Sequence, residues 1–74
     1  MPRPPVCRAR ETLAALRRAG FVLDHQTGSH AILYKPGHPN PITLPMHSGD
    51  LKLGTLRRII KDAGLTLDEF RRLL

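Results

Sequence analysis

Residues 20–34, which read Gly-Phe-Val-Leu-Asp-His-Gln-Thr-Gly-Ser-His-Ala-Ile-Leu-Tyr, decide the fold of this chain. Residues 21–26 and residues 29–35 each read as a strand, in which successive side chains point to opposite faces. The Thr27-Gly28 pair between the two runs is typical of a tight hairpin turn. The stretch therefore predicts two antiparallel strands joined by that turn.

The same alternation assigns side chains to the two faces of the hairpin. On the first strand, one face is expected to carry Phe21, Leu23 and His25. On the second strand, one face is expected to carry His30, Ile32 and Tyr34, and the other Ala31 and Leu33.

A third strand is predicted over residues 42–46, where the apolar residues again alternate. Pro41 and Pro45 have no N–H to donate to a strand ladder, so this strand is expected at an edge of the sheet. The connection into it begins with Lys35-Pro36-Gly37-His38, which matches a type II turn.

Helical spacing of apolar residues is found on both sides of the strands. A first helix is predicted from about residue 8 to residue 19, and its apolar stripe is Ala9, Leu13 and Leu16. A second is predicted from about residue 51 to residue 63, and its stripe is Leu53, Leu56, Ile59, Ile60 and Ala63. Gly20 and Gly64 are placed to end these helices. The capping box Thr66-Leu67-Asp68-Glu69 then starts a short last helix.

The predicted order is α-β-β-β-α with a short C-terminal helix, an α+β fold. A three-stranded antiparallel sheet with both long helices on one face buries all the apolar stripes together and leaves the other sheet face open. Residues 1–7, rich in proline, are expected to form an irregular N-terminal arm, and residues 8–74 a single domain.

Composition narrows the class of partner. The 74 residues include 12 Lys or Arg against 6 Asp or Glu, giving a net charge of +6. Such a chain favours polyanions, nucleic acid first. One cysteine, no secretion signal and no apolar run of about 20 residues favour a cytoplasmic location. Only three residues are aromatic, which argues against a platform of several stacking rings.

His30 is the first candidate for chemistry. RNA is cut when a base removes the proton of a 2′-OH, and a histidine is suited to that role near neutral pH. Gly28 and Ser29 before it allow the backbone to approach a ligand closely. The alternative is a half-buried strand histidine that bonds a neighbouring carbonyl group.

The other histidines are weaker candidates. His47 could be the general acid, a phosphate contact or a loop residue. His25 and His38 are expected to be surface residues. His47 and Asp50 have no third ligand at a metal-binding spacing, so neither a metal nor another cofactor is expected.

The start of the second long helix is a candidate phosphate site. The N–H groups of a helix start point outward, and Gly54 removes a side chain from the approach. The expected RNA contacts there and nearby are Lys35, Lys52, Gly54, Thr55, Arg57, Arg58 and Lys61. The alternative is a solvated helix face.

Four motifs in this order closely resemble the HicA toxin family. They are Ala19-Gly20-Phe21, Gly28-Ser29-His30, Leu44-Pro45-Met46-His47, and Lys52-Leu53-Gly54-Thr55-Leu56-Arg57-Arg58-Ile59-Ile60, followed by Ala63-Gly64-Leu65 with Glu69-Phe70. The resemblance implies the fold of double-stranded RNA-binding domains and an mRNA interferase of a toxin–antitoxin pair. It also implies that the histidine of the Gly-Ser-His motif, His30, is catalytic, and that a HicB-like antitoxin covers it.

The residues and the resemblance together predict an endoribonuclease toxin that cuts mRNA without a metal and is neutralised by an antitoxin. It is expected to be a monomer alone and a hetero-oligomer with its antitoxin. A non-catalytic double-stranded RNA-binding module is the alternative, because it shares the fold and the charge but has no need of His30. A domain that binds only an acidic protein is a third interpretation.

Overall fold

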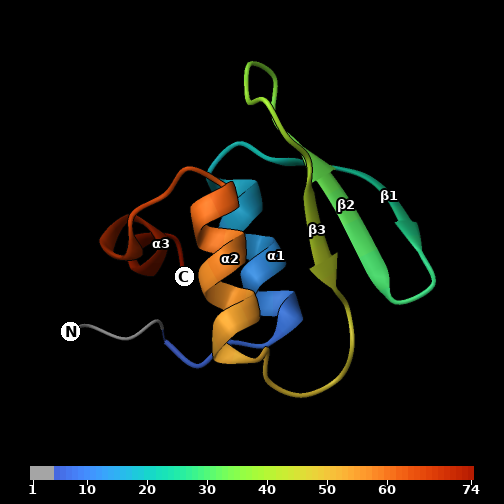
Figure 1. Cartoon of the computed structure of the whole chain (residues 1–74), viewed down its shortest axis with the longest axis vertical. Helices are drawn as coiled ribbons and strands as arrows, with labels where there is room; N and C mark the ends of the chain where they lie inside the picture. The colour runs from blue at the N-terminus through green and yellow to red at the C-terminus, as the bar shows by residue number, and fades with distance from the viewer. Residues whose placement is uncertain (1–4) are drawn as a thin grey trace.

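The computed structural model describes residues 5–74, which form a small α+β domain (Figure 1). Its elements are α1 (Ala9–Arg18), β1 (Val22–Thr27), β2 (His30–Tyr34), β3 (Ile42–Pro45), α2 (Leu53–Asp62) and α3 (Leu67–Leu73). The order confirms the predicted α-β-β-β-α arrangement with a short last helix, consistent with a fold like that of double-stranded RNA-binding domains. Residues 1–4 of the predicted arm lie outside the described residues.

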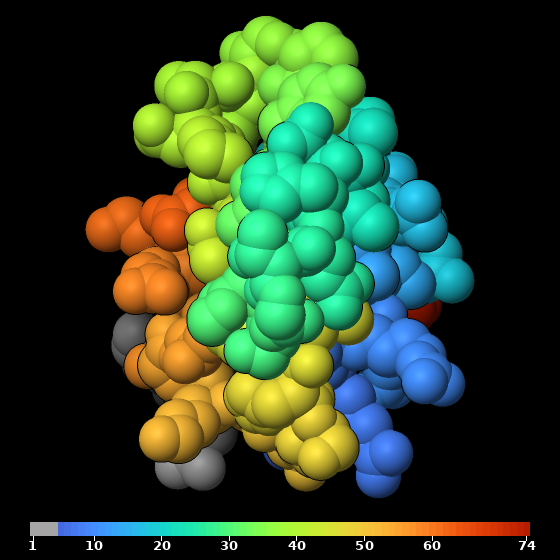
Figure 2. All heavy atoms as spheres, turned by 90° about the vertical axis from the view of Figure 1, so that its right-hand side faces the viewer, coloured from blue at the N-terminus to red at the C-terminus, as the bar shows by residue number. Residues whose placement is uncertain are grey.

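The sheet is antiparallel in the order β1-β2-β3, so β3 is an edge strand as its prolines predict. Figure 1 shows α1 and α2 side by side against one face of the sheet, with α3 on the far side of these helices. Both long helices begin at the end of the molecule where the β1–β2 hairpin turns. No helix covers the other sheet face, which turns toward the viewer in Figure 2 and is called the open face below.

A bulge in β1 corrects one predicted face. Leu23 is paired with Leu33, but the register then shifts, and His25 rather than Asp24 is paired with Ile32. Because one extra residue reverses the alternation of a strand, His25 joins Ile32 on the open face. The prediction that His25 shares a face with Phe21 and Leu23 is therefore wrong.

The hairpin turn lies one residue later than predicted. Thr27 is paired with His30, so the two-residue loop is Gly28-Ser29. Gly28 has a φ of 51°, and no residue other than glycine has a positive φ in the described chain. This matches a turn with a left-handed first position, which favours glycine.

The two long helices end in the same way. The N–H of Gly20 donates to the Arg17 carbonyl (3.0 Å), and the N–H of Phe21 to the Leu16 carbonyl (3.0 Å). Equivalent bonds run from Gly64 to Lys61 and from Leu65 to Ile60. These paired hydrogen bonds satisfy the last carbonyl groups of each helix and confirm the predicted helix ends.

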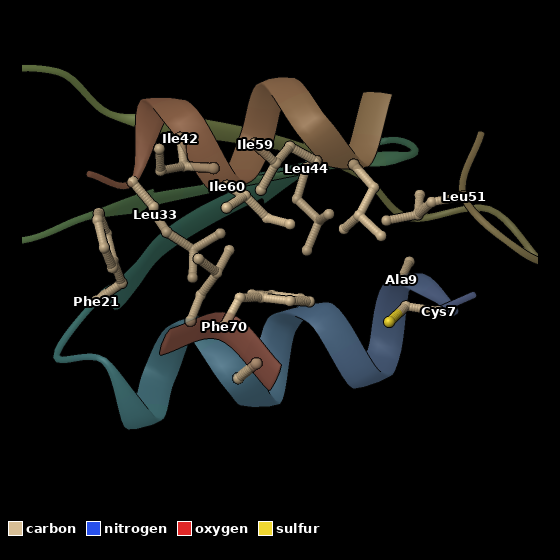
Figure 3. Close-up of a cluster of buried hydrophobic side chains, with 14 of the residues drawn as sticks. Cys7, Ala9, Phe21, Leu33, Ile42, Leu44, Leu51, Ile59, Ile60 and Phe70 are labelled. Carbon is tan, nitrogen blue, oxygen red and sulfur yellow. The ribbon is translucent and has the colours of Figure 1, made fainter. Parts of the chain in front are cut away.

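The core lies between the sheet and the helices and is closed by α3 (Figure 3). Its largest fully buried side chains include Leu16, Leu33, Leu44, Ile59 and Phe70. Phe70 therefore fixes α3 to the domain.

The start of α2 differs from the prediction. Lys52 is the N-cap, so the helix begins at Leu53, whose side chain is 43% exposed. Leu51 is buried in its place, and its N–H donates to the Cys7 carbonyl (2.8 Å). Cys7, although outside any helix or strand, is itself a core residue.

Candidate functional site

The hairpin presents His30 at the first position of β2. Its cross-strand partners are Thr27 and Pro45, and alternation with buried Ala31 places its side chain on the open face. The ring is exposed, and within residues 5–74 it makes no hydrogen bond or ion pair. The alternative of a half-buried histidine bonded to a carbonyl group is not what the structure shows.

His47 lies at the same end of the sheet as His30. The N–H of Met46 donates to the carbonyl of Ser29, which keeps the chain after β3 beside the hairpin turn. The exposed His47 ring has Nδ1 3.1 Å from the Ser48 carbonyl oxygen. A carbonyl only accepts, so this bond places a proton on Nδ1 and leaves Nε2 facing solvent for a ligand.

A hollow of about 400 Å³ adjoins His47 and brings in residues that the sequence did not suggest. It is lined by residues 46–49 and by residues 8–11 at the start of α1. Arg8 and Arg10 therefore stand beside His47, although they are far from it in the chain. Arg8 and Asp50 form an isolated β-bridge that joins these two segments. No local sequence pattern predicts the pairing of Arg8 with Asp50.

Within residues 5–74, no side chain caps the start of α2. Lys52 makes no side-chain cap, and the first turn contains no acidic residue. At α1, by contrast, Glu11 Oε1 accepts from the Arg8 N–H (2.9 Å), and at α3 Glu69 Oε1 accepts from the Thr66 N–H (2.8 Å). The open N–H groups and the positive end of the helix dipole make the α2 start suited to an anion.

A basic stripe continues from that helix start. Its members are Arg57, Arg58 and Lys61, all exposed, which follow the exposed Gly54 at i+3, i+4 and i+7. The buried side chains of α2 lie on its other side, so the stripe faces solvent. In Figure 2, α2 appears in orange next to the green hairpin.

Lys35 lies apart from the other candidate residues. It follows the last residue of β2, about 16 Å from His30 at the usual rise of a strand. Its Nζ stands 5.7 Å from the centre of the Phe21 ring. Lys61 is also remote from the helix start, since it lies in the last turn of α2. In Figure 1 the β1–β2 turn, the chain after β3 and the start of α2 lie toward one end of the molecule, whereas the end of β2 and the last turn of α2 lie toward the other. The candidates Gly28, Ser29, His30, His47, Lys52, Gly54 and Thr55 belong to the first group of segments, and Lys35 and Lys61 to the second.

Two further features bear on the class of protein. Among residues 5–74, no three His, Cys, Asp or Glu side chains come together as ligands for a metal ion. No helix in the described chain is long and apolar enough to cross a membrane.

Comparison with protein families gives a match that includes most of the site. Residues 9–65 match the family described as the HicA toxin of bacterial toxin–antitoxin systems. The chain belongs to the HicA toxin family. The HicA match includes the hairpin, His47 and α2, and it ends before α3. A search of curated proteins finds no significant match. Membership of the HicA family makes the chain a toxin of a toxin–antitoxin pair and implies an antitoxin partner.

Proposed function

We propose that this HicA-family chain is an endoribonuclease in which the His30 imidazole removes the proton of a ribose 2′-OH. The observation that carries the proposal is the exposed His30 ring, which has no partner within the described chain and stands at the same end as the open α2 start. A base of this kind needs access to a polymer more than it needs a deep cavity.

The reaction balances without an added reactant. The 2′-oxygen attacks the adjacent phosphorus while His30 takes its proton, and the bond from phosphorus to the 5′-oxygen breaks. The 5′-oxygen then takes up a proton, from His47 when that ring is protonated or from water. The products are a 2′,3′-cyclic phosphate and a 5′-OH end. DNA has no 2′-OH and is spared.

Binding of the RNA backbone falls to the residues around His30. The open N–H groups of the α2 start, with Lys52, can hold a phosphate, and Ser29 lies beside the reacting group. Arg57 and Arg58 add long-range attraction. Arg8 and Arg10 in the hollow beside His47 provide a second cationic surface at the same end.

The antitoxin of this toxin is expected to be an acidic, HicB-like protein that covers His30 and the α2 start. The cations that attract RNA also attract such a partner, so the two should compete for the toxin.

The decisive experiment compares His30→Ala with His25→Ala, both exposed histidines on the open face of the same hairpin. His30→Ala should fold and bind RNA but lose about 10²–10⁴-fold of its cleavage rate in EDTA. His25→Ala should cut normally. Full cleavage by a folded His30→Ala protein, or products that end in a 5′-phosphate, would overturn the proposal.

A second candidate is a non-catalytic double-stranded RNA-binding module, and the open α2 start favours it because such modules grip phosphates there. In that case wild-type protein and His30→Ala would bind an RNA duplex equally, and neither would cut it.

A further inference from the structure

A second hollow, distinct from the one beside His47, opens at the other end of the open face. It measures about 450 Å³, within the range of small-molecule sites. Its lining consists of Asp24, Ile32, Tyr34 and the segment from Lys35 to Pro41, of which Lys35, His38, Pro39, Asn40 and Pro41 take part. It is called the Tyr34 hollow here. Ile32 and Tyr34 belong to the same row of β2 as His30, so the hollow and the candidate base share one strand and one face.

The walls of the Tyr34 hollow are held in place before any ligand arrives. The His38 N–H at the backbone donates to the Lys35 carbonyl (2.9 Å) and closes the predicted type II turn. The His38 ring has Nε2 2.6 Å from the Asp62 carbonyl and packs edge-on against Phe21. These contacts fix the 36–41 loop, which projects beyond the end of the sheet in Figure 2.

The apolar part of the lining suits a flat ring, and Lys35 at the edge of the hollow can attract the phosphate that flanks it. The Tyr34 side chain is 45% exposed and offers a face for stacking, while Ile32 and two prolines give apolar surroundings. The β1 bulge sets Asp24 and His25 opposite Ile32, which explains how the Asp24 carboxylate reaches the open face. Asp24 Oδ2 lies 2.6 Å from Nδ1 of His25, and the remaining lone pairs of the carboxylate can accept from the amino and imino N–H groups of a base.

We propose that the Tyr34 hollow binds one unpaired base of the RNA substrate, stacked on Tyr34 and hydrogen-bonded to Asp24, and so selects the cleavage position. This inference rests on the proposed cleavage at His30. The three aromatic residues of the chain cannot make a platform of several rings, but one ring beside one carboxylate suffices for one base.

The distance between the two sites sets where the base lies. Tyr34 is about 13 Å from His30 along β2. A stacked strand covers about 3.4 Å per nucleotide, so the selected base lies within about four nucleotides of the cut, or fewer where the strand is splayed. Asp24 favours a base that presents two N–H donors on its edge, as guanine does.

Binding can be tested apart from cleavage, because Tyr34 is the sole tyrosine and the chain has no tryptophan. Intrinsic fluorescence of His30→Ala protein should be quenched, to saturation, by single-stranded oligonucleotides that contain guanine. Oligouridine should quench it less. Unchanged tyrosine fluorescence under conditions where fluorescence anisotropy shows the RNA to be bound would overturn the proposal.

Cleavage mapping on a pool of random RNA tests selection. Tyr34→Ala should lower kcat/KM about 5- to 100-fold, the effect of losing one stacked base, and weaken one fixed base preference near the cut. Asp24→Asn should change which base is preferred. The matched control is Val22→Ala, since Val22 is exposed and paired with Tyr34 but does not line the hollow. Its preference should equal that of the wild type.

The outcomes separate the two proposals. Cleavage by the wild type with preferences that Tyr34→Ala and Asp24→Asn leave unchanged removes the base site and leaves the nuclease. Quenching by guanine-containing RNA that Asp24→Asn weakens, without any cleavage by the wild type, keeps the base site and removes the nuclease.

Discussion

The two ends of the helix layer use their polar groups in opposite ways. At the end where α1 and α2 stop, glycine caps satisfy carbonyl groups and His38 bonds the Asp62 carbonyl. At the end where they start, His30 has no partner in the described chain and the α2 N–H groups have no side-chain acceptor. His38 is hydrogen-bonded and half-buried, whereas His30 is exposed and has no hydrogen-bond partner among the described residues. The contrast separates a stabilising residue from a candidate for chemistry within one small domain.

The sharpest way to break this contrast is His38→Ala. The substitution removes the bond to the Asp62 carbonyl and the edge contact with Phe21, so we expect a loss of about 1–3 kcal/mol in the free energy of unfolding. Urea denaturation measures it. The variant should still cut RNA through His30, but with a looser base preference because the 36–41 loop is no longer held.

The matched control is His25→Ala. His25 is exposed, and among the described residues its ring makes a polar contact with the neighbouring Asp24 alone, so its loss should change stability by less than about 0.5 kcal/mol. Equal stability of the two variants would remove the structural role given to His38.

A second prediction closes the open helix start. Thr55 occupies the position in α2 that Glu11 occupies in α1, three residues after the N-cap. Thr55→Glu should stabilise the helix by about 0.3–1 kcal/mol through its dipole and the Lys52 N–H. The same carboxylate should repel phosphate and weaken RNA binding.

Binding titrations at several salt concentrations test whether Thr55→Glu weakens RNA binding. Thr55→Glu should also reduce the slope of log K against log salt by about one unit for each phosphate that the variant no longer binds. Thr55→Gln, which can cap without a charge, is the control. Tighter RNA binding by Thr55→Glu would mean that no phosphate sits at the α2 start.

The smallest expected effect concerns α3, whose start is capped. The hydrogen bond from the Thr66 backbone N–H, and to a smaller extent the Thr66 side chain, lower the pKa of Glu69 below its ordinary value. A lowered carboxyl pKa stabilises the fold above the unfolded pKa, and that stability is lost as pH falls through the folded pKa. Thermal melts from pH 6 to pH 2.5 should therefore show a shallower decline for Glu69→Gln than for the wild type. Identical pH profiles would contradict the role of the capping box.

Local patterns in the sequence were enough to predict most of the fold. Alternation, helical spacing, two glycine stops and one capping box each depend on residues close together in the chain. The bulge at Asp24 was missed because strand geometry was applied without interruption from Phe21 to Gln26, and no residue there marks an extra position. The sequence placed Leu53 in the buried stripe, whereas Leu51 is the buried residue. The error arose because Lys52, the N-cap, is not a residue type that marks a helix start.

The candidate site was predicted only where its residues are contiguous. His30 and the α2 start could be read from short motifs. Arg8 and Arg10 could not, because their place beside His47 depends on pairing between the start of α1 and the 46–50 loop. The partner of His38 was missed for the same reason, since Asp62 is far along the chain.

The bridge between Arg8 and Asp50 also has a consequence for the order of folding. It joins segments more than forty positions apart, and the neighbouring bond from Leu51 to Cys7 does the same. Such contacts require closure of a long loop and form late relative to the hairpin. During synthesis, the hollow beside His47 cannot assemble until α2 begins to leave the ribosome. Under the proposed function, a nascent chain therefore exposes His30 before it can hold RNA in that hollow. An interrupted chain lacking residues after 50 is therefore expected to be harmless to the cell that makes it.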